Sequence, residues 1–209
     1  MDKGKFITFE GGEGAGKSTQ IHHLAAALRN KNIDVLETRE VGGSLSAEAI
    51  RELWLSPKDG YWDTLTELLL IMAARREHLA KTVFPALERG VWVLSDRFVD
   101  STRAYQGIGL NLGLDTVEIV YRLIAPNFAP DLTLLLDLPV EEGLARVAQR
   151  GGQDDRYQQQ GIAFHATLRN AYLTLAKKEP SRFRIIDARQ DEATVAASIN
   201  RVVAEAFAQ

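Results

Sequence analysis

A glycine-rich stretch near the start of the chain has the spacing needed to hold phosphate groups. Residues 9–20 read FEGGEGAGKSTQ, which places the pattern G-x-x-x-x-G-K-[ST] between an apolar run and a segment of helical period. In this pattern glycines turn backbone N–H groups toward an anion, the lysine reaches the outer phosphates, and the hydroxyl is placed for Mg²⁺. The stretch is a P-loop, and its predicted nucleotide-binding residues are Gly11, Gly12, Glu13, Gly14, Ala15, Gly16, Lys17, Ser18 and Thr19.

The turn of this P-loop lacks a positive charge. Between Gly11 and Gly16 it reads GEGA, so its one charged side chain is the carboxylate of Glu13. Phosphoryl transfer spreads negative charge over the group in flight, and metal ions and positioned cations must stabilise that charge. Part of the positive charge must therefore come from residues outside the loop.

Asp96 is the predicted partner of the P-loop hydroxyl in binding a metal ion. It follows the apolar run at residues 91–94, which puts it at the carboxyl end of a predicted strand. A carboxylate in this place can hold Mg²⁺ directly or through water. We therefore predict Ser18 and Asp96 as the metal ligands.

Three arginines could bind a second anion. Arg39 follows the second apolar run, Arg97 follows Asp96 directly, and Arg75 lies within a long helical segment. Loops after successive parallel strands meet at one edge of the sheet, where ligands bind in such folds. The planar guanidinium can donate to two oxygens of a phosphate at once. Two of these arginines should therefore face one crevice, although any single one could instead be a solvated surface charge.

The elements that must position these residues alternate along the chain. Short apolar runs occupy residues 6–9, 33–36, 91–94, 132–136 and 183–186. Segments of helical period lie near residues 17–30, 46–55, 65–89, 115–125, 140–149, 161–178 and 191–206. The alternation predicts an α/β P-loop fold, with a five-stranded parallel sheet flanked by helices on both faces. With no linker-like composition, residues 1–209 are expected to form a single domain.

Composition narrows the classes of function. The chain has 209 residues, a formal net charge of −3 and no cysteine. The charge balance disfavours binding to a nucleic-acid polymer, and the missing cysteines exclude disulfides and thiol nucleophiles. No run of about 18 apolar residues and no signal-peptide pattern occurs, so we expect a cytoplasmic protein without a membrane segment.

The sequence resembles a known family along nearly its whole length. The matching stretches are FITFEGGEGAGKSTQ, TREVGGS, TELLLIMAARREHL, LSDRFVDSTRAYQG, PDLTLLLDLPVEEGLAR and RGGQDDRYQQQ. Together they resemble thymidylate kinase, and the pairing of the P-loop with D-R-[aromatic]-x-x-[ST]-x-x-A-Y-Q-G is highly specific. The resemblance implies that the phosphate acceptor is dTMP and that the protein is a homodimer.

The resemblance also implies roles at the matching positions. Glu10 and Lys17 would lie beside the reacting phosphates, and Arg39 and Arg97 would hold the phosphate of dTMP. Arg75 would contact the edge of thymine, which suits a guanidinium because it can donate to a base carbonyl.

Further positions would contact the base and the sugar. Thr102 would hydrogen bond to the base, and Tyr105 would lie against the deoxyribose, where its ring would exclude a 2′-hydroxyl. Simple core packing is the alternative role for Tyr105. Ile71 stands where the family commonly has an aromatic ring over thymine, so the stacking contribution is lost. Ser101 and Gln106 complete the predicted substrate-binding set.

Two further departures concern loops. The family usually has Arg-Glu-Pro-Gly-Gly where this chain has REVGG, so Val41 replaces the proline that would fix the loop after Arg39. The polar segment RGGQDDR carries one residue more than the family's usual R-G-x-x-D-R.

The polar segment at about residues 149–161 joins two predicted helices and is interpreted as a lid. It carries Arg150 and Arg156. In this respect the sequence resembles bacterial-type members of the family, in which the P-loop lacks a basic residue and a lid arginine approaches the transferring phosphate. A cation that arrives on closure stabilises transition-state charge and helps exclude water. Both arginines are candidates for the missing charge, and a solvated charged loop is the alternative.

The sequence thus predicts a kinase that transfers the γ-phosphoryl group of ATP to dTMP with the aid of Mg²⁺. Its predicted catalytic residues are Lys17, Glu10, Arg97, Arg150 and Arg156. Two alternatives remain open from the residues alone. One is a kinase of another nucleotide or nucleoside, and the other is a P-loop protein that switches a partner on and off.

Overall fold

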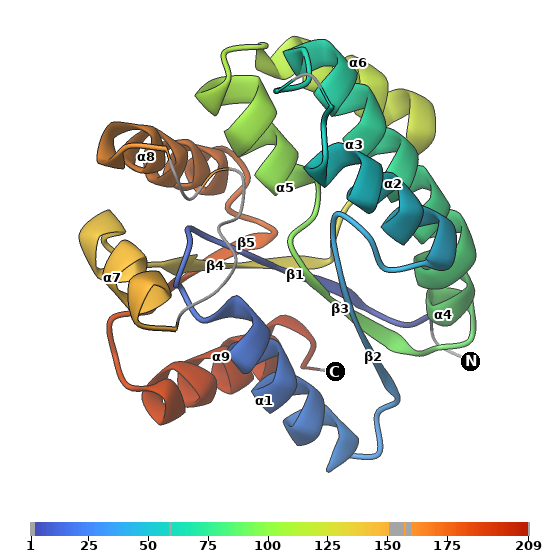
Figure 1. Ribbon diagram of the computed structural model, residues 1–209. Coiled ribbons are helices and arrows are strands. Elements are labelled where there is room, and N and C mark those ends of the chain that lie inside the picture. Colours follow the sequence, from blue (N-terminus) through green and yellow to red (C-terminus); the bar gives the residue numbers. More distant parts are fainter. Residues whose placement is uncertain (1–2, 59, 151–156, 158–159, 209) are drawn as a thin grey trace.

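Five parallel strands form the centre of the computed structural model, which describes residues 3–58, 60–150, 157 and 160–208. The strands lie in the order β2-β3-β1-β4-β5, and helices cover both faces of the sheet (Figure 1). This arrangement confirms the predicted α/β fold. The strands are β1 Phe6–Glu10, β2 Val35–Arg39, β3 Trp92–Asp96, β4 Leu132–Asp137 and β5 Phe183–Asp187.

The helices lie close to the predicted segments, with two exceptions described below. They are α1 Lys17–Arg29, α2 Leu45–Leu55, α3 Thr64–His78, α4 Phe84–Glu88, α5 Val99–Thr102, α6 Leu114–Ile124, α7 Val140–Arg150, α8 Ile162–Lys178 and α9 Glu192–Ala206. Two π-helical segments, η1 Leu79–Val83 and η2 Arg103–Gly109, follow α3 and α5.

The single helix predicted for residues 65–89 is wrong in detail, because η1 separates α3 from α4. Pro85 lies in the first turn of α4. A proline has no N–H to donate to the carbonyl four residues earlier, so the regular α-helical bond to Lys81 is missing and the backbone can widen there.

The segment after Arg97 is helical although the helical candidates omit it. Residues 99–109 form α5 and η2, and their buried side chains include Asp100, Thr102, Tyr105 and Gln106. Apolar periodicity cannot detect a helix that is buried through polar side chains. The sequence motif that marks the predicted acceptor site is therefore carried on a helix rather than on a loop.

The second strand begins and ends later than the run at residues 33–36 predicts. β2 pairs with β3 through Arg39, which lies opposite Asp96. β2 is an edge strand with half-buried and exposed side chains, so polar residues are tolerated where a central strand would need apolar ones. As a result Arg39 ends a strand beside the end of β3.

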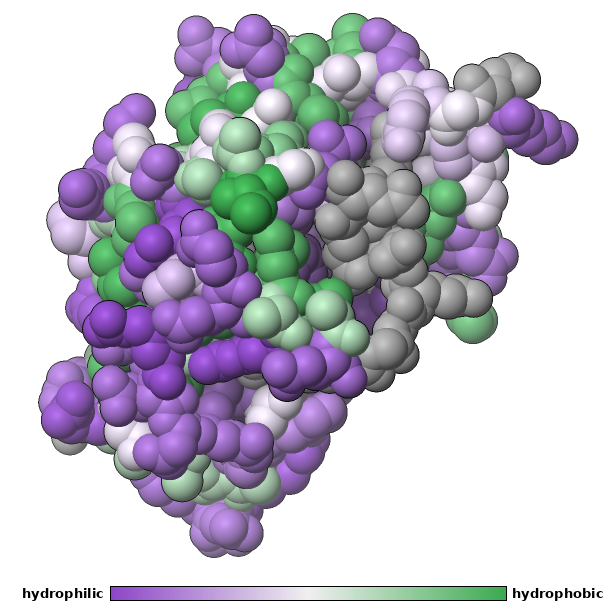
Figure 2. All heavy atoms as spheres, turned by 60° about the vertical axis from the view of Figure 1, so that its left-hand side comes forward, coloured by the Kyte–Doolittle hydropathy of each residue, from purple (hydrophilic) through white to green (hydrophobic). Residues whose placement is uncertain are grey.

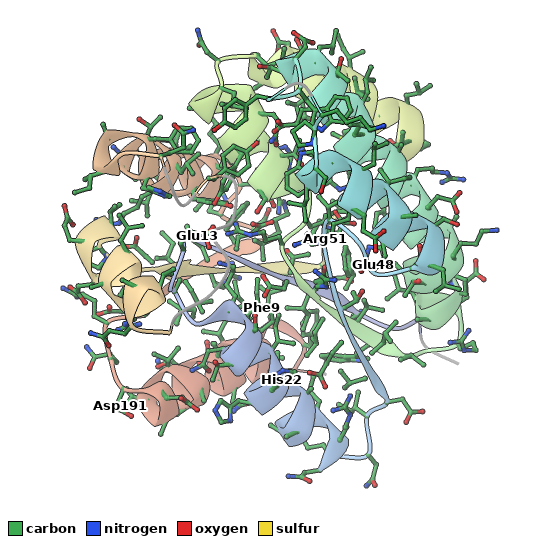
Figure 3. All side chains as sticks on the ribbon, viewed as in Figure 1. Phe9, Glu13, His22, Glu48, Arg51 and Asp191 are labelled. Atoms are coloured by element: carbon green, nitrogen blue, oxygen red, sulfur yellow. The ribbon has the colours of Figure 1, made fainter. Side chains whose placement is uncertain are left out.

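The core holds the sheet between two helical layers. Phe9 and Ile7 pack with α1 and α9 on one face, as Figure 3 shows for Phe9, whereas Phe6 packs with α3 and α6 on the other. On the side of α7 and α8, hydrophilic side chains cover much of the surface (Figure 2). Within the described part of the chain, no helix is long and apolar enough to cross a membrane.

The turn of the P-loop packs closely against α7. A Cβ atom added to Gly14 would lie 2.2 Å from the carbonyl oxygen of Gly143, and one added to Gly143 would lie 2.3 Å from that of Glu13. Neither distance leaves room for a side chain. Gly143 thus lets the start of α7 support the backbone that must cradle phosphates.

Replacing Gly143 by alanine should disturb this contact. We expect Gly143→Ala to lower the free energy of unfolding by about 1–3 kcal/mol, the usual cost of overpacking, and to raise the KM for ATP, the phosphate donor that the sequence predicts. Gly161→Ala is the matched control, because a Cβ at Gly161 has nothing within 4 Å. Urea denaturation and steady-state kinetics measure both effects, and equal behaviour of the two variants would contradict the close contact.

Candidate active site

Lys17 spans the mouth of the P-loop. Its Nζ donates hydrogen bonds to the carbonyl oxygens of Gly11 at 3.2 Å and Gly12 at 2.9 Å, and its side chain is buried. Burial lowers the pKa of Lys17, and the neighbouring Arg97 lowers it further, against the opposing effect of Glu13. The ammonium group is thus held where an incoming phosphate could replace the two carbonyl oxygens as its partner.

The predicted metal ligands lie together. Ser18 Oγ donates to Asp96 Oδ2 at 2.6 Å, at the point where α1 begins beside the end of β3. Both residues line a groove of about 400 Å³ that Arg39 and Thr38 also reach. The hydroxyl and the carboxylate offer oxygen atoms, which are the ligands that Mg²⁺ prefers.

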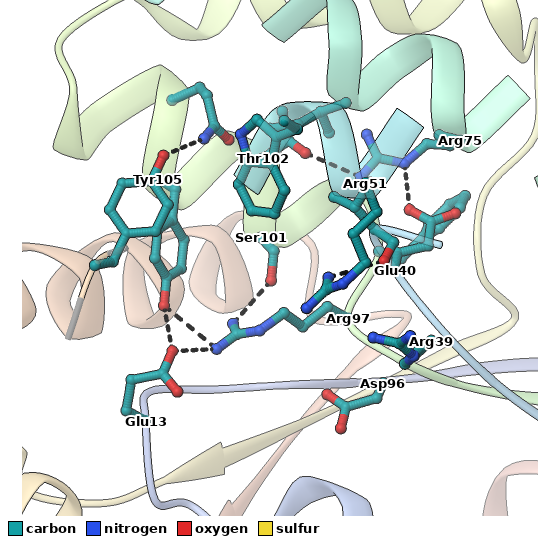
Figure 4. Close-up of a pocket in the computed structure, with 16 residues that line it drawn as sticks. Glu13, Arg39, Glu40, Arg51, Arg75, Asp96, Arg97, Ser101, Thr102 and Tyr105 are labelled. Atoms are coloured by element: carbon teal, nitrogen blue, oxygen red, sulfur yellow. Dashed lines mark hydrogen bonds and ion pairs between the residues drawn. The ribbon is translucent and has the colours of Figure 1, made fainter. Parts of the chain in front are cut away.

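A second cavity of about 210 Å³ opens on the other side of Asp96 (Figure 4). We call it the arginine cleft. It is lined by Glu13, Arg39, Glu40, Val41, Arg51, Trp54, Ile71, Arg75, Asp96, Arg97, Phe98, Ser101, Thr102, Tyr105, Gln106 and Tyr157. Two of the three candidate arginines were expected to face one crevice, whereas all three line this cavity, in different environments.

Arg97 joins the P-loop to the cleft. Its Nη1 donates to Gly11 O at 3.3 Å and to Ser101 Oγ at 3.1 Å, and its Nη2 donates to Glu13 Oε1 at 2.6 Å. The hydroxyls of Tyr105 and Tyr172 accept further bonds at 3.3 and 3.1 Å. These contacts come from the P-loop, α5, η2 and α8, so the guanidinium is held in one orientation.

Glu13 is the anion that this arginine already binds. Burial would raise the pKa of Glu13, but Arg97, Lys17 and the hydroxyl of Tyr105 stabilise the carboxylate and lower that pKa to about 2. Tyr105 donates to Glu13 Oε1 at 2.9 Å. The side chain inside the P-loop is thus ionised and faces the arginine cleft.

Arg75 lies on another wall of the cleft and is deeply buried. Its Nε donates to Glu40 Oε2 at 2.6 Å, and its Nη2 donates to Thr102 Oγ1 at 2.9 Å. Ile71, one turn earlier on α3, is buried and lines the same cavity. The geometry brings together an arginine, a hydroxyl and an aliphatic side chain on one wall of the cleft.

Arg39 differs from the other two arginines because its side chain is half exposed and pairs with Glu48. Its Nη2 donates to Glu48 Oε2 at 2.9 Å, and Glu48 Oε1 accepts a bond from the backbone N–H of Gly43. Figure 3 shows Glu48 on α2, beside the strand ends. Arg39 lines both the cleft and the groove. Among the hydrogen bonds of the described residues, none joins Arg39 to Arg97.

Glu10 lies beneath the cleft, at the end of β1. Its Oε1 accepts from the backbone N–H of Phe98 at 2.8 Å, and its Oε2 accepts from Ser101 Oγ at 2.6 Å. Burial and the nearby charge of Asp100 raise the pKa of Glu10 to about 7, against the opposing effects of Ser101 and Arg97. Its charge therefore changes near neutral pH.

Gln106 also lines the cleft, and buried groups hold its amide. Its Nε2 donates to Glu67 Oε1 at 2.6 Å and to the hydroxyl of Tyr157 at 3.1 Å. The ring of Tyr157 meets that of Tyr105 edge to face, with centroids 5.0 Å apart. The ring of Tyr105 is thus buried between the cleft and Tyr157.

Sequence reasoning missed several residues that line the cleft. Arg51 and Trp54 come from α2, Glu40 and Val41 follow β2, and Tyr157 lies in the polar segment. Arg51 Nη1 donates to the carbonyl oxygen of Val41 at 2.9 Å. The i, i+3 spacing of Arg51 and Trp54 places both on one helical face, which is the signal that could have identified them.

The predicted lid joins α7 to α8. α7 ends at Arg150 and α8 begins at Ile162, in agreement with the predicted helix ends. The side chains of Arg150 and Arg156 lie outside the described residues. Their predicted role stays a prediction.

The chain is similar to known proteins along almost its whole length. The sequence profile of the family described as Thymidylate kinase matches residues 9–199. Thymidylate kinases of Pseudomonas syringae pv. tomato and Caulobacter vibrioides are 50% identical over 202 residues and 48% identical over 205 residues. These matches cover 97% and 98% of this chain, and 96% and 98% of the relatives.

A solved structure is similar as well. The crystal structure of thymidylate kinase from Ehrlichia chaffeensis matches with a TM-score of 0.77 and 33% sequence identity. The match covers 96% of this chain and 99% of that one.

The raised pKa of Glu10 predicts a pH-dependent stability. An unfolded glutamate releases its proton near pH 4.5, whereas folded Glu10 keeps it up to about pH 7. Between these values the folded state binds one proton more, so its contribution to stability is full below pH 4.5 and is lost as pH rises toward 7. The wild type should therefore lose stability relative to Glu10→Gln between pH 5 and pH 8.

Urea denaturation across this pH range measures the difference between the two proteins. Glu52→Gln, which removes an exposed carboxylate on α2, serves as the matched control. Parallel pH profiles for the wild type and Glu10→Gln would contradict the shifted pKa.

Proposed function

The chain belongs to the thymidylate kinase family and catalyses the ATP-dependent phosphorylation of dTMP to dTDP, and we propose that the P-loop holds ATP while the arginine cleft holds dTMP. The observation that supports this division most directly is the position of Arg97. It contacts the P-loop through Gly11 and Glu13 and faces the cleft through Ser101 and Tyr105. An acceptor phosphate bound there would lie next to the donor phosphates.

On the donor side, the P-loop backbone from Gly11 to Gly16 would surround the phosphates of ATP, with Ser18 and Thr19 at the start of α1. Lys17 would leave the carbonyl oxygens of the loop and bind the phosphoryl group in flight. Since α1 begins directly after the loop, its N-terminus also favours the anion.

Ser18 and Asp96 would hold Mg²⁺ together with the phosphates. Both oxygen atoms are of the kind that a hard cation prefers, and the hydrogen bond of 2.6 Å between them holds them side by side. Among the described residues, no group of three or more His, Asp and Glu is placed to hold a metal ion, and Mg²⁺ bound mainly through phosphates and water needs none. When bound, the ion would neutralise charge on the donor phosphates.

On the acceptor side, Arg97 would bind the dTMP phosphate and Arg39 would assist from the rim of the cleft. Arg97 is preorganised by its hydrogen bonds, whereas Arg39 would have to exchange its pairing with Glu48. Preorganised charge contributes most to catalysis, so Arg97 is the stronger catalytic candidate. Glu10 would lie below the reacting phosphates and hold Ser101 in place.

The far end of the cleft would hold the nucleoside. Arg75 and Thr102 would hydrogen bond to thymine and Ile71 would cover its ring, while Tyr105 would lie against the deoxyribose. Gln106, fixed by Glu67, would line the base pocket. The reaction needs no covalent enzyme intermediate, because positioning and charge stabilisation carry out most of the catalysis.

Arg150 and Arg156 are proposed, from the sequence alone, to supply charge to the transferring phosphate when the lid segment closes. Glu13 makes an outside cation necessary, since the turn of the P-loop adds a negative charge and its partner Arg97 is assigned to dTMP. A cation that contacts mainly the transition state raises kcat more than substrate affinity.

A homodimer is also part of the proposal. α3 packs between α2 and α6, and these helices expose a group of large apolar side chains: Leu53, Leu65, Leu69, Ile119 and Leu123. Ile119 is 69% exposed and Leu123 is 82% exposed, so a second copy of the chain could bury them. We further propose that the protein acts in the cytoplasm, where ATP is supplied.

A substrate panel tests the proposed acceptor. Release of ADP should be fast with dTMP, slower with dUMP, and at least about a hundredfold slower in kcat/KM with dCMP, AMP or GMP, because the cleft presents donors to a pyrimidine carbonyl. Comparable rates with dTMP and AMP would refute the assignment of the arginine cleft.

The role of Lys17 in the P-loop has its own test. Lys17→Ala should lower kcat by several orders of magnitude while the protein stays folded.

Tyr105 should control selection of the sugar through its ring rather than its hydroxyl. Tyr105→Ala removes the ring and should raise kcat/KM for ribo-TMP relative to dTMP by about tenfold or more. Tyr105→Phe keeps the ring but loses the bond to Glu13, so it should leave that ratio near the wild-type value. Competition assays measure the ratio, and an unchanged ratio in Tyr105→Ala would mean that the ring is only core packing.

A further inference from the structure

A chain of buried and partly buried polar side chains forms part of the wall of the arginine cleft and continues behind it. Thr38 Oγ1 lies 2.7 Å from His78 Nε2, and His78 Nδ1 lies 2.9 Å from Glu40 Oε1. The other oxygen of Glu40 accepts from Arg75 Nε at 2.6 Å, and Arg75 continues to Thr102. The chain therefore connects β2, the loop after it, α3 and α5.

Glu40 is the anionic centre of this chain. Burial would raise the pKa of Glu40, but Arg75 and then His78 stabilise its carboxylate and hold the pKa below the usual value. Each oxygen has one strong donor, so the carboxylate is fixed from two sides. The ring of His78 in turn requires Gly43, where an added Cβ would lie 2.5 Å from the imidazole.

The contacts of Arg75 leave its guanidinium little freedom. The group is fastened at Nε by Glu40 and at Nη2 by Thr102, while Nη1 lies 3.3 Å from Met72 Sδ. Its charge lies 5.2 Å from the centre of the Phe98 ring. A planar group held at its nitrogens cannot turn in its plane, so the N–H groups that make none of these contacts keep a fixed direction in the wall of the cleft that Arg75 lines.

We propose that Glu40 is a positioning residue for base selection, which clamps Arg75 so that its donors match a carbonyl on the pyrimidine and reject an amino group. This inference rests on the proposed function, in which Arg75 contacts thymine. Thymine presents a carbonyl acceptor at position 4, whereas cytosine presents an amino donor there. A mobile Arg75 could move away from the amino group of cytosine. A clamped Arg75 would instead keep its N–H donors facing the N–H donors of that amino group, which is unfavourable.

His78 secures the clamp from behind. Because Glu40 is ionised, His78 Nδ1 carries the proton that it donates to Glu40 Oε1, and the hydroxyl of Thr38 can donate to Nε2. Without His78, Glu40 would keep one partner and could rotate. The hydrogen bond from His78 to Glu40 therefore controls how firmly Glu40 holds Arg75.

The test is a double-mutant cycle between Glu40→Gln and Arg75→Ala, read as the ratio of kcat/KM for dTMP to that for dCMP. Glu40→Gln keeps the size of the side chain but removes the charge that pairs with Arg75. It should raise the KM for dTMP and lower the ratio by about ten- to a hundredfold, the usual cost of losing a charged hydrogen bond, with kcat within about threefold of wild type. Arg75→Ala should lower the ratio at least as far.

In the Arg75→Ala background, adding Glu40→Gln should change the ratio no further, because Glu40 acts through Arg75. Glu118→Gln is the matched control, since it removes a carboxylate from an arginine pair of similar geometry, with Arg103 Nε at 2.6 Å, away from the cleft. This control should keep the wild-type ratio.

A second pair of variants tests the clamp without changing Glu40. His78→Asn puts an amide N–H near the position of Nδ1 and should retain most of the selectivity, whereas His78→Leu provides no donor and should lower the ratio. This pair supplies the test if Glu40→Gln does not fold. Equal ratios for the two His78 variants would overturn the proposal.

The outcomes separate the inference from the proposed function. If Arg75→Ala leaves the dTMP to dCMP ratio unchanged, the proposed contact of Arg75 with thymine is wrong and the clamp has no role. If Arg75→Ala lowers the ratio but Glu40→Gln does not, or if the two effects multiply in the double variant, only the positioning role is overturned.

Discussion

The guanidinium of Arg97 is the contact on which both halves of the site depend. It donates to a P-loop carbonyl, to Glu13 within the P-loop turn, and to hydroxyls on α5, η2 and α8. Separate elements of the chain thus meet at one fixed positive charge. Preorganised charge of this kind needs no rearrangement when negative charge develops on a phosphoryl group. The same side chain helps to keep Glu13 ionised and hydrogen bonds to the hydroxyl of Tyr105.

Around this charge, two buried carboxylates, Glu10 and Glu40, and the partly buried carboxylate of Glu13 differ in the direction of their pKa shifts. Burial acts on all three in the same direction. It prevails at Glu10, where Asp100 adds repulsion, so the pKa rises to about 7. It is overcome at Glu13 by Arg97 and Lys17, and at Glu40 by Arg75 and His78. Neighbouring charges, more than burial, thus decide which carboxylate is ionised at neutral pH.

The departures from the family pattern are accommodated by packing. Val41, which replaces the usual proline, is partly buried against a core cluster that also contains Ile71 and Trp54. Its carbonyl oxygen accepts a hydrogen bond from Arg51, which ties the loop after β2 to α2. An aliphatic wall and a side-chain bond therefore hold the loop in this chain.

The sequence by itself determined the local features of this protein. The P-loop and the strand runs are recognisable because glycine spacing and apolar periodicity are written in neighbouring residues, and Lys17, Ser18 and Asp96 were predicted from them. The tertiary structure alone decided the extent of β2, the helical form of residues 99–109 and the close contact of Gly143 with the P-loop. It also decided that Glu40 pairs with Arg75, which lies 35 positions away. The physical reason is that a buried polar group must find a partner, and that partner is chosen by how strands and helices pack rather than by spacing along the chain.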